Sequence, residues 1–166
     1  VGSISKESNN YLGLVNIGLI AFAVVIFLTD GMNALNGLNR SYFHPDGDPY
    51  FQAGAFNIAI RYISYAFVAL VLVSCFRYIR LSLLKVNLKI PFDAMLHLTI
   101  LWVTSYELMN VLDIYGSREA DKLGMSILWG VYALFLISLG IWKKQKHLRI
   151  GAIALFAVTL IKLFVY

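Results

Sequence analysis

Long apolar runs, separated by short polar segments, constrain this chain more than any other feature of its sequence. A helix needs about 20 mostly apolar residues to cross the ~30 Å hydrocarbon core of a bilayer, because each residue adds only ~1.5 Å. Five segments have about this length: 11–29, 54–76, 92–114, 123–142 and 148–166. Lipid offers no hydrogen-bond partner to backbone groups, so each segment is expected to be helical. We therefore predict an all-α fold, a polytopic integral membrane helical bundle of about five transmembrane helices in a single domain over residues 1–166.

The composition supports a membrane protein and argues against a soluble domain. Of the 166 residues, 60% are hydrophobic and 14% are charged. Soluble domains average about 45–50% apolar and about 25% charged residues, and a small domain buries only part of its apolar surface. The net charge is +5, but the basic residues lie in short segments between the apolar runs. That distribution is typical of membrane topology, so we expect the lipid bilayer, and not nucleic acid, as a partner.

The charges of the connecting segments predict the orientation of the chain. Two of them, "RYIRLSLLKVNLK" (77–89) and "KKQKHLR" (143–149), are basic and contain no acidic residue. The alternate segments, 30–54 and 115–124, contain aspartate or glutamate. Because loops rich in lysine and arginine stay in the cytoplasm, the N-terminus is expected to be cytoplasmic and residue 166 to lie at the outer face.

The long outer segment after the first apolar run leaves one structural alternative open. Met32, Leu35 and Leu38 are spaced three residues apart, so this part is expected either to extend the first helix or to lie along the membrane surface. Further on, Asp46 and Asp48 resemble the start of a calcium loop, but the remaining ligand positions are missing. We therefore predict no metal site in this segment.

The sequence contains no recognisable catalytic or cofactor motif. It has no phosphate-binding loop, nucleophile elbow or dinucleotide fingerprint. His97 has no second histidine or acid four residues away, so it is expected to be a packed or backbone-bonded residue and not a metal ligand. We predict no cofactor, and the catalytic residues, if the chain is an enzyme, stay unknown.

Three ionisable residues lie inside the apolar segments, namely Arg61, Glu107 and Lys162. Counting ~1.5 Å per residue places each of them about 10 Å below the outer surface. Charges at such a depth are costly and normally face the interior of the bundle, where they pair. Polar residues accompany them at helical spacing: Asn57 and Tyr65 beside Arg61, and Asn110 beside Glu107. These six residues are the candidate ligand-binding residues.

Three explanations of the intramembrane charges remain open. Arg61 and Glu107 can pair only to fix how their helices pack, or Arg61 and Lys162 can extend to the outer interface. Alternatively, Arg61 and Lys162 hold an anionic group in an outward-facing pocket, while Glu107 orients them or acts as an acid or base. The residue types suit phosphate or carboxylate recognition, but they specify no reaction.

The last two apolar runs carry a pattern that resembles a known family. The segment "LWGVYALFLISLGIWKKQKHLRIGAIALFAVTLIKLFVY" (128–166) is similar to the terminal helix pair of a bacterial family of predicted membrane proteins, domain of unknown function 2339. The matching residues are Trp129, Tyr132, Gly140, Leu148, Arg149, Gly151, Lys162, Leu163 and Phe164. "RYISYAF" (61–67) and "SYEL" (105–108) also resemble this family, so the resemblance covers about residues 55–166.

The resemblance implies a fold of many helices in the bacterial envelope, with no established activity. In such proteins an aspartate commonly follows the position of Tyr166, and further helices usually precede this region. We therefore expect the chain to be part of a longer polytopic protein. Its expected partners besides the bilayer are the remainder of its own chain or a second copy in a homo-oligomer.

These observations predict a multi-pass protein of the bacterial inner (cytoplasmic) membrane. We expect a module that binds or transports an anionic or lipid-linked ligand at its outward-facing polar cluster. One alternative is a membrane-embedded transferase that acts on lipid-linked envelope substrates. Another is a purely structural scaffold in which the charges serve only packing.

Overall fold

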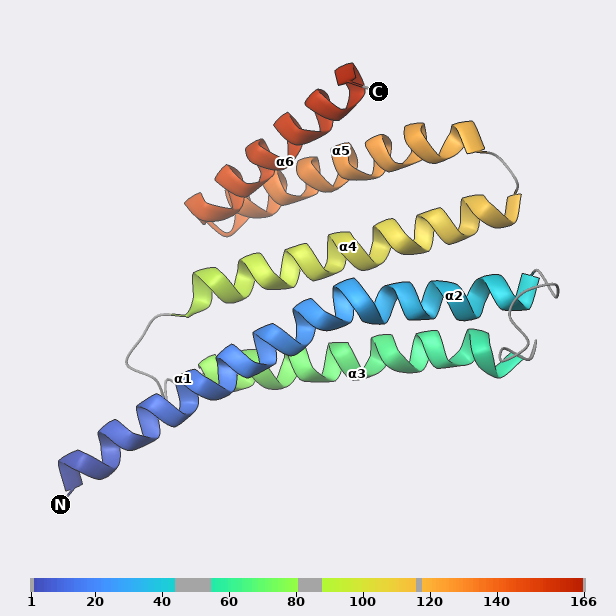
Figure 1. Ribbon diagram of the computed structural model, residues 1–166. Coiled ribbons are helices and arrows are strands. Elements are labelled where there is room, and N and C mark those ends of the chain that lie inside the picture. The colour runs from blue at the N-terminus through green and yellow to red at the C-terminus, as the bar shows by residue number, and fades with distance from the viewer. Residues whose placement is uncertain (1, 44–54, 81–87, 116–117, 166) are drawn as a thin grey trace. The chain divides into compact units, whose positions relative to one another are not determined.

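The computed structural model describes residues 2–43, 55–80, 88–115 and 118–165, and these residues are almost entirely helical (Figure 1). In chain order the elements are α1 (Gly2–Ile26), the π-helical turn η1 (Phe27–Gly31), α2 (Met32–Phe43), α3 (Ala55–Arg80), α4 (Lys89–Tyr115), α5 (Arg118–Trp142) and α6 (Lys146–Val165). No strand occurs in these ranges, so the predicted all-α fold is confirmed. Asp46 and Asp48 lie outside the described residues.

The chain divides into two compact units, Val1–Phe92 and Asp93–Tyr166. The first unit contains α1, η1, α2 and α3, and the second contains most of α4 together with α5 and α6. The single domain expected from the sequence stays a prediction.

In the first unit, α1, η1 and α2 form one continuous helical rod that runs beside α3 (Figure 1). Val24, Leu28, Met32 and Leu35 are buried on one face of this rod, because they are spaced three or four residues apart. The sequence leaves open whether this part extends the first helix or lies along the membrane surface. The unbroken helical rod decides between the two. The residues after Thr29 extend the first helix.

The π-helical turn interrupts the rod at Phe27–Gly31. The Phe27 ring packs against the position where Gly31 lacks a side chain, since a Cβ at Gly31 would lie 2.9 Å from Cδ2 of that ring. The Thr29 hydroxyl donates to the carbonyl oxygens of Val25 and Ile26, at 3.1 Å and 3.2 Å. Such turns occur mostly as single insertions within α-helices and are frequent at functional sites.

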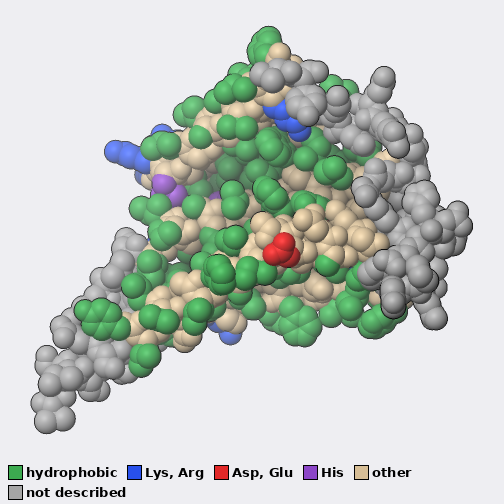
Figure 2. Space-filling model, in the orientation of Figure 1, with side chains coloured by type: hydrophobic (Ala, Val, Ile, Leu, Met, Phe, Trp, Pro, Cys, Tyr) green, Lys and Arg blue, Asp and Glu red, His purple; other side chains and the backbone are tan. Residues whose placement is uncertain are grey.

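Both units place large apolar side chains outside and several polar side chains inside. Apolar side chains cover much of the surface seen in Figure 2, and among the exposed ones are Phe22, Phe67, Leu134 and Phe164. Among the residues whose side chains are described, the buried polar ones are Arg61, Thr99, Ser105, Ser126 and Thr159. This distribution is the reverse of that in a soluble domain and fits a lipid environment.

In the second unit, α5 and α6 form an antiparallel hairpin whose backbones approach closely (Figure 1). Ala133 on α5 and Ala152 on α6 are fully buried, at 0% exposure. Small residues allow this approach because two transmembrane helices gain most of their contact energy from close packing. Leu136 and Leu148 complete the buried core, with Tyr132, Ile137, Leu139 and Leu155 packed around it.

The turn from α5 to α6 is a left-handed helix cap. The N–H of Gln145 donates to the carbonyl oxygen of Gly140 at 2.9 Å, and the N–H of Lys144 donates to that of Ile141 at 3.2 Å. Lys144 itself has a φ of 52°, which is the left-handed conformation that glycine usually supplies at this position. The start of α6 then packs over Gly140, where a Cβ would lie 2.6 Å from Cγ and 3.1 Å from the backbone nitrogen of Arg149.

Within the described residues, four helical stretches are long and apolar enough to cross a membrane: Tyr11–Leu38, Ala59–Arg80, Leu123–Trp142 and Lys146–Phe164. They correspond to four of the five predicted spans. The remaining segment, 92–114, forms α4, which is 27 residues long but includes Asp93, His97, Glu107 and Asn110. These polar residues lower its hydropathy, so the crossing of α4 stays a prediction.

We expect Lys144→Gly to raise the free energy of unfolding by about 0.5–1 kcal/mol. Glycine adopts the left-handed conformation without the clash of a Cβ, although its greater freedom in the unfolded chain reduces the gain. Unfolding by sodium dodecyl sulfate in mixed micelles, followed by far-UV circular dichroism, measures this change.

Gly140→Ala is the matched substitution at the other end of the same turn. It is expected to lower the free energy of unfolding by about 1–3 kcal/mol, because the new methyl group has to displace the start of α6. A gain in stability for Gly140→Ala, or a loss for Lys144→Gly, would contradict this turn geometry.

Candidate functional site

The six residues predicted to bind a ligand divide between the two units. The first unit holds Asn57, Arg61 and Tyr65 on α3, and the second holds Glu107 and Asn110 on α4 and Lys162 on α6. The side chain of Asn57 lies outside the described part of the chain. A single cluster that contains Arg61, Glu107 and Lys162 therefore stays a prediction.

Arg61 is a buried cation of the first unit, with only 4% of its surface exposed. Its Nε donates a hydrogen bond to the hydroxyl oxygen of Tyr65, one turn further along α3, at 2.9 Å. The guanidinium carbon also lies 5.8 Å from the centroid of the Tyr65 ring, within the range of a cation–π contact. Tyr65 thus holds the guanidinium through both its hydroxyl and its ring.

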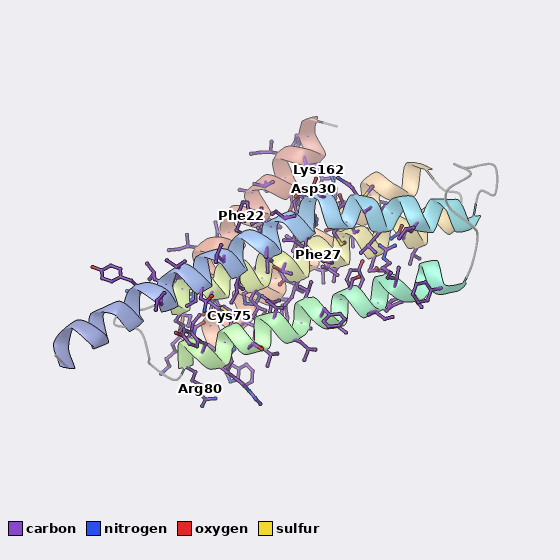
Figure 3. The ribbon with its side chains drawn as sticks, turned by 60° about the horizontal axis from the view of Figure 1, so that its bottom comes forward. Phe22, Phe27, Asp30, Cys75, Arg80 and Lys162 are labelled. Atoms are coloured by element: carbon purple, nitrogen blue, oxygen red, sulfur yellow. The ribbon has the colours of Figure 1, made fainter. Side chains whose placement is uncertain are left out.

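Tyr65 is itself held between two other rings. Phe27, in the π-helical turn, meets it edge to face with ring centroids 6.5 Å apart, and Tyr62 does so at 6.2 Å. Figure 3 shows Phe27 on the rod beside α3, with Asp30 further along the same turn. The π-helical turn therefore supports the residue that orients Arg61.

Lys162 is the half-buried cation near the end of α6. Its Nζ lies 5.0 Å from the centroid of the Trp129 ring on α5. Among the described side chains, no carboxylate forms an ion pair with it. The Trp129 ring is consequently the recorded neighbour that stabilises this positive charge.

Trp129 is fixed by a chain of hydrogen bonds that reaches α4. Its indole Nε1 donates to the Ser105 hydroxyl oxygen at 3.0 Å, and that hydroxyl donates to the Leu101 carbonyl oxygen at 2.7 Å. Ser105 is buried, at 6% exposure. Lys162, Trp129 and Ser105 therefore connect α6, α5 and α4 at one level of the second unit.

Glu107 and Asn110 lie on a different side of α4. The side that faces α5 is marked by Ser105 and by Leu108 and Leu112, which lie closest to Gly124 of α5. At about 100° per residue, Glu107 is about 160° and Asn110 about 140° around the helix from Ser105. A shared site for Glu107 and Lys162 therefore stays a prediction.

The two histidines of the second unit join helices. His97 Nδ1 lies 3.0 Å from the hydroxyl of Tyr132, which also donates to the His97 carbonyl oxygen at 3.2 Å. With the proton on Nδ1, the hydroxyl both accepts from the ring and donates to the carbonyl oxygen, and the expected hydrogen-bonded role of His97 fits this geometry. His147 Nε2 lies 3.2 Å from an oxygen of Asp93, so it connects the starts of α6 and α4.

Sequence reasoning missed the contributions of Trp129, Ser105 and Phe27. The sequence singles out Trp129 only as part of the family pattern, and Phe27 is one of many apolar residues in the first run. Periodicity relates residues on the same helix, whereas these three act on residues of other helices. Their roles depend on how each helix is rotated, and no spacing in the sequence reports that rotation.

Comparison with protein families gives a match over nearly the whole chain. The model of the family described as "Predicted membrane protein (DUF2339)" matches residues 5–166. This chain belongs to the DUF2339 family. The match confirms the resemblance seen in the sequence and extends it towards the N-terminus. The DUF2339 chain is therefore a membrane protein, in agreement with its four candidate spans. No curated protein and no solved structure matches it.

We expect Ser105→Ala to lower the free energy of unfolding of the DUF2339 chain by about 0.6–2 kcal/mol, because the indole N–H of Trp129 loses its buried acceptor. In the Trp129→Phe background, the same substitution should cost less, since no indole N–H remains. A double-mutant cycle in detergent micelles measures the difference.

Thr104→Ala is the matched control for this cycle. Its exposed hydroxyl bonds only to the Ile100 and Leu101 carbonyl oxygens of its own helix. It is expected to change stability by less than about 0.5 kcal/mol. Equal losses for Ser105→Ala with and without Trp129 would show that the hydrogen bond between α4 and α5 contributes nothing.

Proposed function

We propose that the DUF2339 chain binds an anionic group, a phosphate or a carboxylate, within the outer half of the membrane. The ligand is a lipid or a lipid-linked compound, and binding serves transport or maintenance of the envelope. The observation that carries the proposal is the environment of the Lys162 side chain. This side chain is a cation in an apolar helix, held over the Trp129 ring, with no carboxylate paired to it among the described side chains.

The free energies involved favour a ligand at this position. A lysine at the centre of a membrane helix costs about 2.5–3.5 kcal/mol, and the cost is smaller for Lys162 because it lies in the last turn of α6. A cation–π contact returns about 0.5–2 kcal/mol. A charge-assisted hydrogen bond to an anion contributes about 1.5–3 kcal/mol. An anionic ligand therefore offsets the part of the cost that Trp129 leaves.

Arg61 is a second cation within an apolar helix, in the first unit. Tyr65 fixes its guanidinium through Nε, and a fixed, planar guanidinium suits phosphate and carboxylate groups. The sequence places Arg61 at the depth of Lys162 and Glu107, and we propose that Asn57, Tyr65 and Asn110 contribute to recognition. The double variant Arg61→Gln/Lys162→Gln distinguishes one shared binding site from two. The losses of binding free energy caused by the two single substitutions should add if the sites are independent, and should not add if both cations bind the same anion.

Lys162→Gln is expected to weaken the binding of dodecyl phosphate by about 10- to 100-fold, the equivalent of the lost charge-assisted hydrogen bond. Calorimetric titration of the chain in a neutral maltoside detergent measures this affinity. Lys162→Arg keeps the charge and should retain most of it. Arg77→Gln removes an exposed cation at the end of α3 and serves as the control.

Two further titrations identify the source of the anion. Laurate tests whether a carboxylate replaces the phosphate, and inorganic phosphate tests whether the acyl chain matters. Inorganic phosphate that binds as tightly as dodecyl phosphate would indicate a free anion as ligand. Equal affinities of wild type and Lys162→Gln for every probe would leave the charges with a purely structural role and refute the proposal.

We also propose a location in the bacterial inner membrane, with the N-terminus in the cytoplasm and residue 166 at the outer face. The two basic segments, 77–89 and 143–149, support this orientation. In a Cys75→Ser background, a membrane-impermeant maleimide should label Ser117→Cys in spheroplasts but label Gln145→Cys only after lysis. The opposite pattern would reverse the topology.

A further inference from the structure

The tip of the α5–α6 hairpin, defined as residues 142–149, is strongly basic. Its exposed cations are Lys143, Lys144, Lys146 and Arg149. Among the described side chains, the acid recorded in contact with the tip is Asp93, 3.2 Å from His147. The first turn of α6 contains no acidic residue, although negative charge there would stabilise the helix. The second unit thus leaves this positive charge largely uncompensated.

Two positions of the tip carry residues that local stability does not favour. Lys144 occupies the left-handed position, with a φ of 52°, where glycine avoids the clash of a Cβ. Lys146 begins α6, where the helix dipole disfavours a cation. Sequences that break two local rules at one place usually do so for a function. Here both exceptions add positive charge to the same surface.

Apolar side chains border these cations. Trp142, the last residue of α5, is 80% exposed, and Ile141 and Ile150 on the two flanking helices are also exposed. Tryptophan favours the boundary between hydrocarbon and headgroups, and lysines just beyond that boundary reach the phosphate level. In Figure 2, Lys and Arg side chains project beside a histidine on the surface of the molecule. The exposed isoleucines are therefore followed, towards the end of the hairpin, by the Trp142 indole and then by the cations.

We propose that the hairpin tip is a docking surface for the headgroups of anionic phospholipids. The charge is complementary to the lipid phosphate, and juxtamembrane basic segments attract anionic lipids. A soluble anionic partner would use the cations but would leave Trp142 and the exposed isoleucines without a role. A lipid contacts both parts of the surface at once. This surface is separate from Lys162, which lies near the opposite end of α6.

The double variant Lys144→Gly/Lys146→Gln tests the proposal. In neutral maltoside micelles, added phosphatidylglycerol is expected to raise the unfolding temperature of the wild-type chain. The variant removes two of the four exposed cations of the tip, so its shift should fall to about half. Because glycine suits the left-handed position, the variant should be no less stable than wild type without lipid. A gain in basal stability together with a loss of the lipid effect is a combination that misfolding cannot produce.

Arg118→Gln/Lys122→Gln is the matched control, since it removes the same charge from the segment 115–124, which also contains acidic residues. It should keep the full phosphatidylglycerol shift, and Lys144→Arg/Lys146→Arg should keep it as well. The proposal fails if Lys144→Gly/Lys146→Gln retains the wild-type shift, if the control loses as much, or if inorganic phosphate produces the shift equally well. Repeating the pair in the Lys162→Gln background separates the tip from the proposed outer site.

Discussion

A polar side chain inside a membrane has no water to bond, and the helices of this chain are arranged around that constraint. Most hydroxyl groups meet it locally by donating to a carbonyl oxygen one turn earlier, as Ser64, Ser74, Thr99, Ser138 and Thr159 do. Ser105 goes further, because it also accepts the indole N–H of Trp129 and so ties α4 to α5. Of the two intramembrane cations, Arg61 bonds to Tyr65 one turn along its own helix, whereas Lys162 contacts the Trp129 ring of α5.

Both described units stabilise an intramembrane cation with an aromatic side chain. Tyr65 does this for Arg61 with its hydroxyl and its ring, and Trp129 does it for Lys162 with its ring alone. An aromatic ring lowers the cost of a buried positive charge without neutralising it. For Lys162, a carboxylate partner would cancel the charge, whereas the Trp129 ring keeps it available to an anion. This difference connects the packing of the helices to the proposed binding function.

The sequence predicted the helices well because apolar runs of membrane length leave the backbone few alternatives. It also located Arg61 and Lys162 inside the apolar helices, where the structure places them. It did not predict the π-helical turn, since no residue in 27–31 excludes an ordinary helix. Nor did it predict the partnership of Lys162 with Trp129, which depends on the rotation of α5 against α6. The left-handed Lys144 was equally hidden, because the position usually belongs to glycine.

The central claim is that Lys162 meets an anion inside the membrane, and solid-state NMR can detect that contact directly. With ¹⁵N-labelled lysine side chains and a phosphate-bearing lipid in the bilayer, dephasing between nitrogen and phosphorus reports their proximity. The account predicts two contributions to the dephased lysine signal in the wild type. The contribution of Lys162 is lost in Lys162→Gln and persists in Lys144→Gly/Lys146→Gln, whereas the contribution of the hairpin tip remains in Lys162→Gln. Dephasing that is unchanged by Lys162→Gln would show that no phosphate reaches this residue and would contradict the account.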